Sequence, residues 1–257
     1  MPEPIPQSKV VVAATRGGPE ALHLTDRPVP RPGDGEVLVK VAAAGVAFGD
    51  IMVREGLVRD APRPLNPGYD VAGMIVGVGT GVMEVSVGQK VVASTGGWGG
   101  YATHVVVPSW RVVPYTSDIR PEVATSLVLD YLTAYQMLRR TTNLEPGATV
   151  LIHSAAGGVG SALVQLGALR GLNKFGTSSA GKATYVARMG AVPIDYRNED
   201  FVARIRQEAP NGLDAIFDGL GVASWRRGFP LLRSNGQLVP YGAPATLKGG
   251  VEAFHDF

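Results

Sequence analysis

Hydrophobic residues in the first half of the chain alternate with other residues over short stretches that glycines and prolines separate. Alternation over about four to eight residues is typical of a strand with one buried face. The pattern predicts strands at residues 37–41, 71–78, 90–93 and 102–107. It also predicts a short helix over 48–55, capped by Asp50. We therefore expect an irregular β-rich domain over residues 1–120, arranged as a small, partly open barrel.

The pattern changes near Pro121, where apolar residues begin to recur at helical spacing. Beyond residue 149, predicted strands lie at residues 150–153, 174–177, 192–195, 215–217 and 238–241. Predicted helices lie at residues 159–170, 182–189, 199–207 and 224–232. Gly171 and Gly190 stand where glycines commonly end helices. Such alternation predicts an α/β domain with a doubly wound parallel sheet over residues 121–257.

Residues 149–166 run from an apolar strand through a turn of small residues into an apolar helix. Ala155, Gly157 and Gly160 take the three small positions of the G-x-G-x-x-G dinucleotide fingerprint, with Ala at the first. The second position lets the backbone approach a pyrophosphate, and the third lets the helix pack closely on the strand. The helix amino end also favours an anion. We therefore predict a dinucleotide site here, although such a turn can also be purely structural.

The end of the second predicted strand indicates which dinucleotide binds. Sheets that prefer NAD usually place Asp or Glu about 20 residues past the fingerprint, for the ribose 2′-OH. This chain instead has Ser178, Ser179 and Lys182, which offer donors and a positive charge to a 2′-phosphate. NADPH is therefore the predicted cofactor, and the alternative is a capping Ser with a solvated Lys182. The near match of residues 176–182 to a P-loop lacks the Mg²⁺-binding hydroxyl, because Ala183 stands there.

Composition excludes several other classes of function. The 257 residues carry a net charge of +2 without a basic run, so nothing indicates a nucleic-acid partner. The absence of Cys excludes disulfides, thiolate zinc sites and a cysteine nucleophile. The histidines show no ligand spacing, so no metal site is predicted. No apolar run reaches the length of a membrane span, and we expect a cytoplasmic protein.

Six motifs together carry a family resemblance. They are Phe48-Gly-Asp-Ile-Met, Pro67-Gly-Tyr-Asp-Val-Ala-Gly, Tyr131-Leu-Thr-Ala-Tyr, His153-Ser-Ala-Ala-Gly-Gly-Val-Gly, Ile194-Asp-Tyr-Arg and Asp218-Gly-Leu-Gly. The chain resembles the medium-chain dehydrogenase/reductases, in their zinc-free quinone oxidoreductase branch and its VAT-1-like group. The resemblance implies a GroES-like N-terminal domain, a Rossmann domain, and NADPH in the cleft between them.

The resemblance also implies roles for individual residues of the second domain. Those expected at the nicotinamide are Thr133, Gly219, Leu220, Tyr241 and Gly242. Those expected at the pyrophosphate are Gly157, Gly158 and Val159, and Ala156 and Gly160 are expected to bind the cofactor in the same turn. Tyr196 joins Ser178 and Lys182 around the 2′-phosphate, although on its own it would read as a half-buried aromatic at a strand end.

The chain departs from the family in three places. Beside Phe48 at the expected substrate wall, Ala47 replaces the usual Asn and Met52 replaces a residue that is often aromatic. The chain ends at Phe257, where relatives usually continue through a further strand and return to the first domain. We therefore expect a fold truncated at its C-terminus. That further strand often serves dimerisation, so a homodimer remains an open alternative.

The chemistry expected from these residues needs no metal. Gly68-Tyr69-Asp70 replaces the Gly-His-Glu of the zinc-dependent relatives. We therefore expect hydride transfer from NADPH directly to a small quinone or α,β-unsaturated carbonyl. Tyr69 and Asp50 are the nearby polar candidates for proton supply, and Asp50 serves equally well as a helix cap. A non-catalytic NADPH-binding structural or regulatory protein and an enoyl-thioester reductase are the alternatives.

Overall fold

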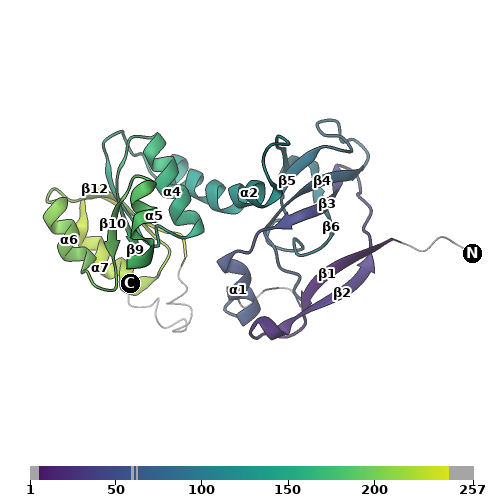
Figure 1. The fold of residues 1–257 in the computed structure, drawn as a ribbon, viewed down its shortest axis with the longest axis horizontal. Coiled ribbons are helices and arrows are strands. Elements are labelled where there is room, and N and C mark those ends of the chain that lie inside the picture. The colour runs from purple at the N-terminus through teal and green to yellow at the C-terminus, as the bar shows by residue number, and fades with distance from the viewer. Residues whose placement is uncertain (1–5, 59–60, 62, 243–257) are drawn as a thin grey trace, which may run out of the picture. The chain divides into compact units, whose positions relative to one another are not determined.

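The computed structural model describes residues 6–58, 61 and 63–242 (Figure 1). It divides into two compact units, Met1–Leu129 and Asp130–Phe257, which are described separately below. Sequence alone placed the division after residue 120. Helix α2, Pro121–Ser126, instead belongs with the first unit, because it contacts strands β3 and β4 there. In the part of the chain that the structure describes, no helix is long and apolar enough to cross a membrane.

The first unit is built on an antiparallel five-stranded sheet in the order β6-β3-β4-β5-β7. Its strands are β3 Glu36–Ala44, β4 Asp70–Val78, β5 Lys90–Ser94, β6 His104–Pro108 and β7 Val112–Pro114. A separate ribbon pairs β1 Gln7–Ala13 with β2 Leu22–Pro28. Alternate residues of the sheet, among them Val37, Val39 and Ile75, form its core. The predicted strands are confirmed, and β1, β2 and β7 were missed. Strand β2 is mostly exposed and β7 has three residues, so both lack a clear apolar alternation.

The second unit is built on a parallel sheet in the order β10-β9-β8-β11-β12. Its strands are β8 Thr149–Ile152, β9 Asn173–Ser178, β10 Val192–Asp195, β11 Leu213–Asp218 and β12 Leu232–Pro240. This is the strand order of a Rossmann half-sheet that starts at β8, with its order reversing between β8 and β11. The predicted doubly wound sheet is therefore confirmed, and β12 begins earlier than its pattern indicated.

Helices cover both faces of this sheet, as successive strand residues show. Val150 and Ile152 of β8 pack in one core with α4, Gly158–Leu169, and α5, Ala183–Arg188. Leu151 packs in the opposite core with α6, Phe201–Glu208. Helix α7, Val222–Gly228, follows β11 and continues as a 3₁₀ turn over Phe229–Leu231. Adjacent strand residues point to opposite faces, so both faces need apolar cover.

The helical segments that follow β9 and precede β8 depart from regular α-helix. The helix predicted from residue 182 begins instead as a 3₁₀ turn over Ala180–Lys182. Before β8, α3 (Leu132–Gln136) lies between two π-helical segments, Leu127–Tyr131 and Met137–Thr141. Gly171 and Gly190 take the positive φ angles of 68° and 90° predicted for residues that end helices.

Candidate cofactor-binding site

Most of the second-unit residues predicted to bind the dinucleotide lie at one edge of the parallel sheet. Residues 156–160 follow β8, Ser178 ends β9 with Ser179 next to it, and Tyr196 follows β10. Gly219 and Leu220 follow β11, and Tyr241 and Gly242 follow β12. Parallel strands end at the same edge, and ligands of such sheets bind where the strand order reverses. Thr133 lies half-buried on α3, which packs against α4.

The turn after β8 is held closely against the sheet. Ser154 adopts a positive φ of 53°, and its carbonyl accepts a hydrogen bond of 2.8 Å from the Gly157 N–H. A Cβ on Gly160 would overlap the same carbonyl, so only glycine fits there. A Cβ on Gly157 would stand 3.2 Å from it, a milder conflict. Gly157 is the N-cap of α4 and is exposed, as a residue that approaches a phosphate must be.

A buried network beneath the turn joins three strand ends. The imidazole Nδ1 of His153, after β8, is hydrogen-bonded to Thr177 Oγ1 of β9 at 3.1 Å. The same Oγ1 accepts the Ser154 N–H at 3.1 Å. The Nε2 of His153 faces Asp218 of β11. The pKa of His153 is lowered chiefly by burial, against the opposing charge of Asp218. Sequence reasoning missed this network, because no spacing rule connects these positions.

Asp218 and Tyr241 shape the part of the edge predicted to meet the nicotinamide. Asp218 Oδ1 accepts the Leu220 N–H at 2.7 Å, which fixes the Gly219–Leu220 turn. The Tyr241 hydroxyl donates to the His153 carbonyl at 3.4 Å. Burial, together with the charges of Asp218 and Asp130, raises the pKa of Tyr241. Tyr241 is therefore a neutral hydroxyl at physiological pH.

The residues predicted for the 2′-phosphate lie at or just after the ends of β9 and β10. The Tyr196 N–H donates to the Ser178 carbonyl at 3.2 Å, and Lys182 lies exposed at the end of the 3₁₀ turn. Ser178 is buried, and its hydroxyl donates to the Ser179 carbonyl. Arg197, which sequence reasoning missed, places its guanidinium 5.8 Å from the Tyr196 ring centroid. Lys182 and Arg197 thus offer two exposed cations to an anion here.

An acidic residue, also missed from sequence, lies at the amino end of α4. Asp130 belongs to the π-helical segment Leu127–Tyr131, and its carboxylate occupies the space where a Gly158 side chain would stand. Burial raises the pKa of Asp130. A carboxylate therefore lies against the turn predicted for pyrophosphate.

In the first unit, Asp50 is an anchor of the backbone. Helix α1, Phe48–Glu55, has the predicted bounds. Asp50 caps it as predicted, but from the third helical position, by accepting the N–H of the N-cap residue Ala47. The Asp50 carboxylate accepts the Ala47 N–H at 2.9 Å, the Gly68 N–H at 2.8 Å and the Tyr101 hydroxyl at 3.0 Å. A buried carboxylate with three donors is well satisfied, which favours anchoring over proton supply.

The other predicted residues of the first unit gather around the same helix. Phe48 is 52% exposed and Met52 is half-buried. The Tyr69 hydroxyl lies against Gly49, where a Cβ would come within 2.8 Å of it. Burial and the charge of Asp50 raise the pKa of Tyr69, which makes its phenol a poorer acid at neutral pH.

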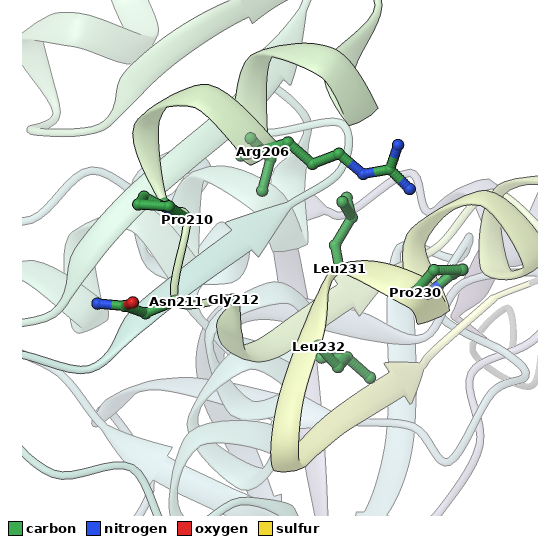
Figure 2. A pocket seen from close by; sticks show the side chains of 9 residues that line it. Arg206, Pro210, Asn211, Gly212, Pro230, Leu231 and Leu232 are labelled. Carbon is green, nitrogen blue, oxygen red and sulfur yellow. The ribbon is translucent and has the colours of Figure 1, made fainter.

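Outside these groups, the described residues form a hollow but no metal-binding cluster. Among the described residues no group of three or more His, Cys, Asp or Glu side chains is placed to hold a metal ion. A hollow of about 340 Å³ lies between the end of α6 and the starts of β11 and β12, lined by Arg206, Pro210, Leu231 and Leu232 among others (Figure 2). It lies at the amino ends of these strands, so it belongs to the edge opposite the phosphate turn.

Comparisons with known proteins agree with this architecture. The sequence profile of the alcohol dehydrogenase GroES-like domain matches residues 33–117, and that of a zinc-binding dehydrogenase matches residues 158–255. The rat synaptic vesicle membrane protein VAT-1 homolog is 37% identical over 249 residues, which cover 95% of this chain and 61% of that protein. Quinone oxidoreductase 1 of Escherichia coli K12 is 31% identical over 240 residues, covering 91% of this chain and 73% of that protein.

Solved structures show the same relationship. A quinone oxidoreductase of Pseudomonas syringae superposes with a TM-score of 0.87 at 33% identity, covering 93% of this chain and 74% of that one. The Escherichia coli quinone oxidoreductase complexed with NADPH gives a TM-score of 0.87 at 30% identity, covering 91% and 73%. The enoyl reductase CurK gives 0.87 at 26% identity, covering 96% and 79%.

The chain spans about 60% of the length of the VAT-1 homologs that it matches. It nevertheless covers nearly three quarters of the bacterial quinone oxidoreductases, above 30% identity. Both predicted domains, GroES-like and Rossmann, are matched. The chain therefore belongs to the medium-chain dehydrogenase/reductase superfamily, in the quinone oxidoreductase branch that includes the VAT-1 homologs.

Proposed function

We propose that this chain is an NADPH-dependent oxidoreductase that reduces a quinone or an α,β-unsaturated carbonyl without zinc. The observation that carries the proposal is the turn of residues 155–160, held against β8 at the reversal of the sheet, with two exposed cations at the neighbouring strand ends. The relatives whose titles name quinone oxidoreductases, one of them complexed with NADPH, support the same activity.

The residues at the sheet edge fit NADPH better than NADH. The first turn of a helix presents N–H groups without intrahelical partners, and these suit a pyrophosphate at α4. At the end of β9, an NADH site would need a carboxylate for the ribose 2′-OH, and Ser178 stands there instead. Lys182 and Arg197 would hold the additional phosphate through charge-assisted hydrogen bonds.

The chain's own contribution to the reaction is positioning. When bound, NADPH supplies a hydride from its nicotinamide ring, and the acceptor carbon must already be electrophilic. The Gly219–Leu220 turn, fixed by Asp218, and the half-buried Tyr241 would orient the ring and exclude water on its side. The predicted substrate residues Ala47, Phe48 and Met52 offer an apolar wall for flat acceptors. Solvent supplies the proton, because Asp50 is held by three donors and Tyr69 is a weakened acid.

The test follows the hydride directly. NADPH deuterated at C4 on each face in turn is mixed with the protein and either a quinone or an enone. Deuterium transferred to the enone carbon from one face only would support direct hydride transfer. NADPH binding without oxidation above the protein-free control would overturn the enzymatic part of the proposal. Stoichiometric zinc in protein purified without a metal-affinity tag, lost together with activity on chelation, would overturn the zinc-free part.

One second function has an observation in its favour. The relatives at 37% identity are named for a synaptic vesicle membrane protein, and their names state no reaction. A non-catalytic NADPH-binding protein would show the same sheet edge and the same cofactor affinity. A panel of quinones, enones and an enoyl thioester separates the two functions, and it also separates a quinone reductase from an enoyl-thioester reductase.

A further inference from the structure

The amino end of α4 carries its own negative group beside the turn assigned to pyrophosphate. The Asp130 carboxylate fills the space that a side chain on Gly158 would take. Gly158 is the first residue of α4 and follows its N-cap, Gly157. The carboxylate and a bound pyrophosphate would therefore be neighbours at one helix end.

The Asp130 carboxylate and a bound pyrophosphate would both be stabilised by the amino end of α4, and they would repel each other. The amide groups and the helix dipole at an amino end stabilise negative charge, but a second negative charge meets the first by repulsion. Asp130 is half-buried, and burial raises its pKa, so its neutral form persists to higher pH than that of an exposed Asp. A neighbouring phosphate would raise this pKa further, because a like charge disfavours ionisation.

The titratable groups that interact with Asp130 include two tyrosines. Tyr131, on the same segment, and Tyr241, after β12, both feel the charge of Asp130, and both have raised pKa values. Their hydroxyls therefore stay neutral at physiological pH. Residues 158–161 of α4 carry no titratable side chain. Asp218, at the end of β11, is a second carboxylate whose charge acts on Tyr241.

We propose that Asp130 sets the affinity for the dinucleotide and links its binding to uptake of a proton by the Asp130 carboxyl. This inference rests on the proposed NADPH site. The neutral acid accepts the pyrophosphate, whereas the carboxylate repels it. The affinity for NADPH therefore falls as pH rises through the range in which the Asp130 carboxyl of the cofactor-free protein ionises. The fall is at most about tenfold per pH unit, as for any single linked proton.

The experiment compares three proteins by calorimetry from about pH 5.5 to about pH 8.5. They are the wild type, Asp130→Asn, which keeps the side-chain shape without the charge, and Glu145→Gln. Glu145 is exposed in the turn before β8, at the far end of that strand from Ser154, so its variant controls for net charge. The 2′-phosphate of NADPH also titrates near pH ~6, but it contributes equally to all three proteins.

We expect Asp130→Asn to bind NADPH about tenfold more tightly at the alkaline end, with a smaller difference toward the acidic end. Proton uptake on binding, measured in buffers of different ionisation enthalpy, should be smaller for Asp130→Asn than for the other two proteins. NADH should show the same Asp130 effect, because it shares the pyrophosphate.

Other outcomes overturn the inference in distinguishable ways. Parallel affinity–pH curves for the wild type and Asp130→Asn would overturn it and leave the NADPH site standing. Weaker binding by Asp130→Asn at every pH would show that the carboxylate supports the turn. If folded protein bound neither NADPH nor NADH at any pH, the proposed function would fail and the inference with it.

Discussion

The imidazole Nε2 of His153 lies 3.7 Å from Asp218 Oδ2, with the two side chains 2% and 0% exposed. At this distance the contact is longer than a hydrogen bond, and neither atom has a hydrogen-bond partner among the residues that the structure describes. His153 and Asp218 end neighbouring strands, β8 and β11, on the two sides of the point where the sheet order reverses. Their packing therefore bears on both turns that are assigned to the cofactor.

Stability should depend on pH through His153. Its pKa in the folded protein is lowered, first by burial, and the charge of Arg227 acts in the same direction. As pH falls, the imidazole of His153 is therefore protonated in the unfolded chain before it is protonated in the folded protein. The free energy of unfolding then decreases below about pH 6.5, by at most about 1.4 kcal/mol per pH unit. His153→Gln should show a shallower loss in urea unfolding, with the exposed His23→Gln as control. Equal slopes for His153→Gln and the wild type would show that His153 does not contribute.

The two glycines of the turn should respond differently to alanine. Gly160→Ala places a methyl group against the Ser154 carbonyl, and we expect a loss of about 1–3 kcal/mol in unfolding free energy. Gly157→Ala meets the same carbonyl at 3.2 Å and should cost less stability, while its methyl group obstructs the phosphate. Chemical denaturation and NADPH titration of both variants measure the two effects. A Gly157 variant that binds NADPH as well as the wild type would contradict its place at the pyrophosphate.

Much of this sheet and its phosphate turn could be predicted from sequence, because the signals are local. Apolar runs of strand length mark β8 to β11, and small residues at 155, 157 and 160 mark the turn. Contacts between distant positions carry no such signal. Tyr101 bonds to Asp50 across 51 residues, and Asp130 meets Gly158 through a π-helical segment that no period indicates.

Cofactor preference should depend on the two exposed cations at β9 and β10. Lys182→Ala should weaken NADPH binding by about 1.5–3 kcal/mol, roughly tenfold to a hundredfold, because a charge-assisted contact to the 2′-phosphate is lost. Arg197→Ala should act in the same direction. NADH affinity should change little in either variant. Arg188→Ala removes an exposed cation from α5 and is the matched control. Equal weakening of both cofactors by Lys182→Ala would mean that Lys182 acts through the fold.

The anchoring role of Asp50 can be separated from a catalytic one through its partner Tyr101. Tyr101→Phe removes the hydroxyl that donates to Asp50 Oδ2 and leaves the carboxylate in place. Hydrogen bonds to charged groups contribute about 1.5–3 kcal/mol, so Tyr101→Phe should lower the unfolding free energy by an amount in this range. Asp50→Asn should cost at least as much, because it weakens the bonds from the Ala47 and Gly68 N–H groups as well.

If Asp50 only anchors the backbone, the folded fraction of both variants should keep kcat within a few-fold of the wild type in the quinone assay. A fall of kcat by about a hundredfold or more in Asp50→Asn alone, with stability like that of Tyr101→Phe, would instead assign the proton to Asp50.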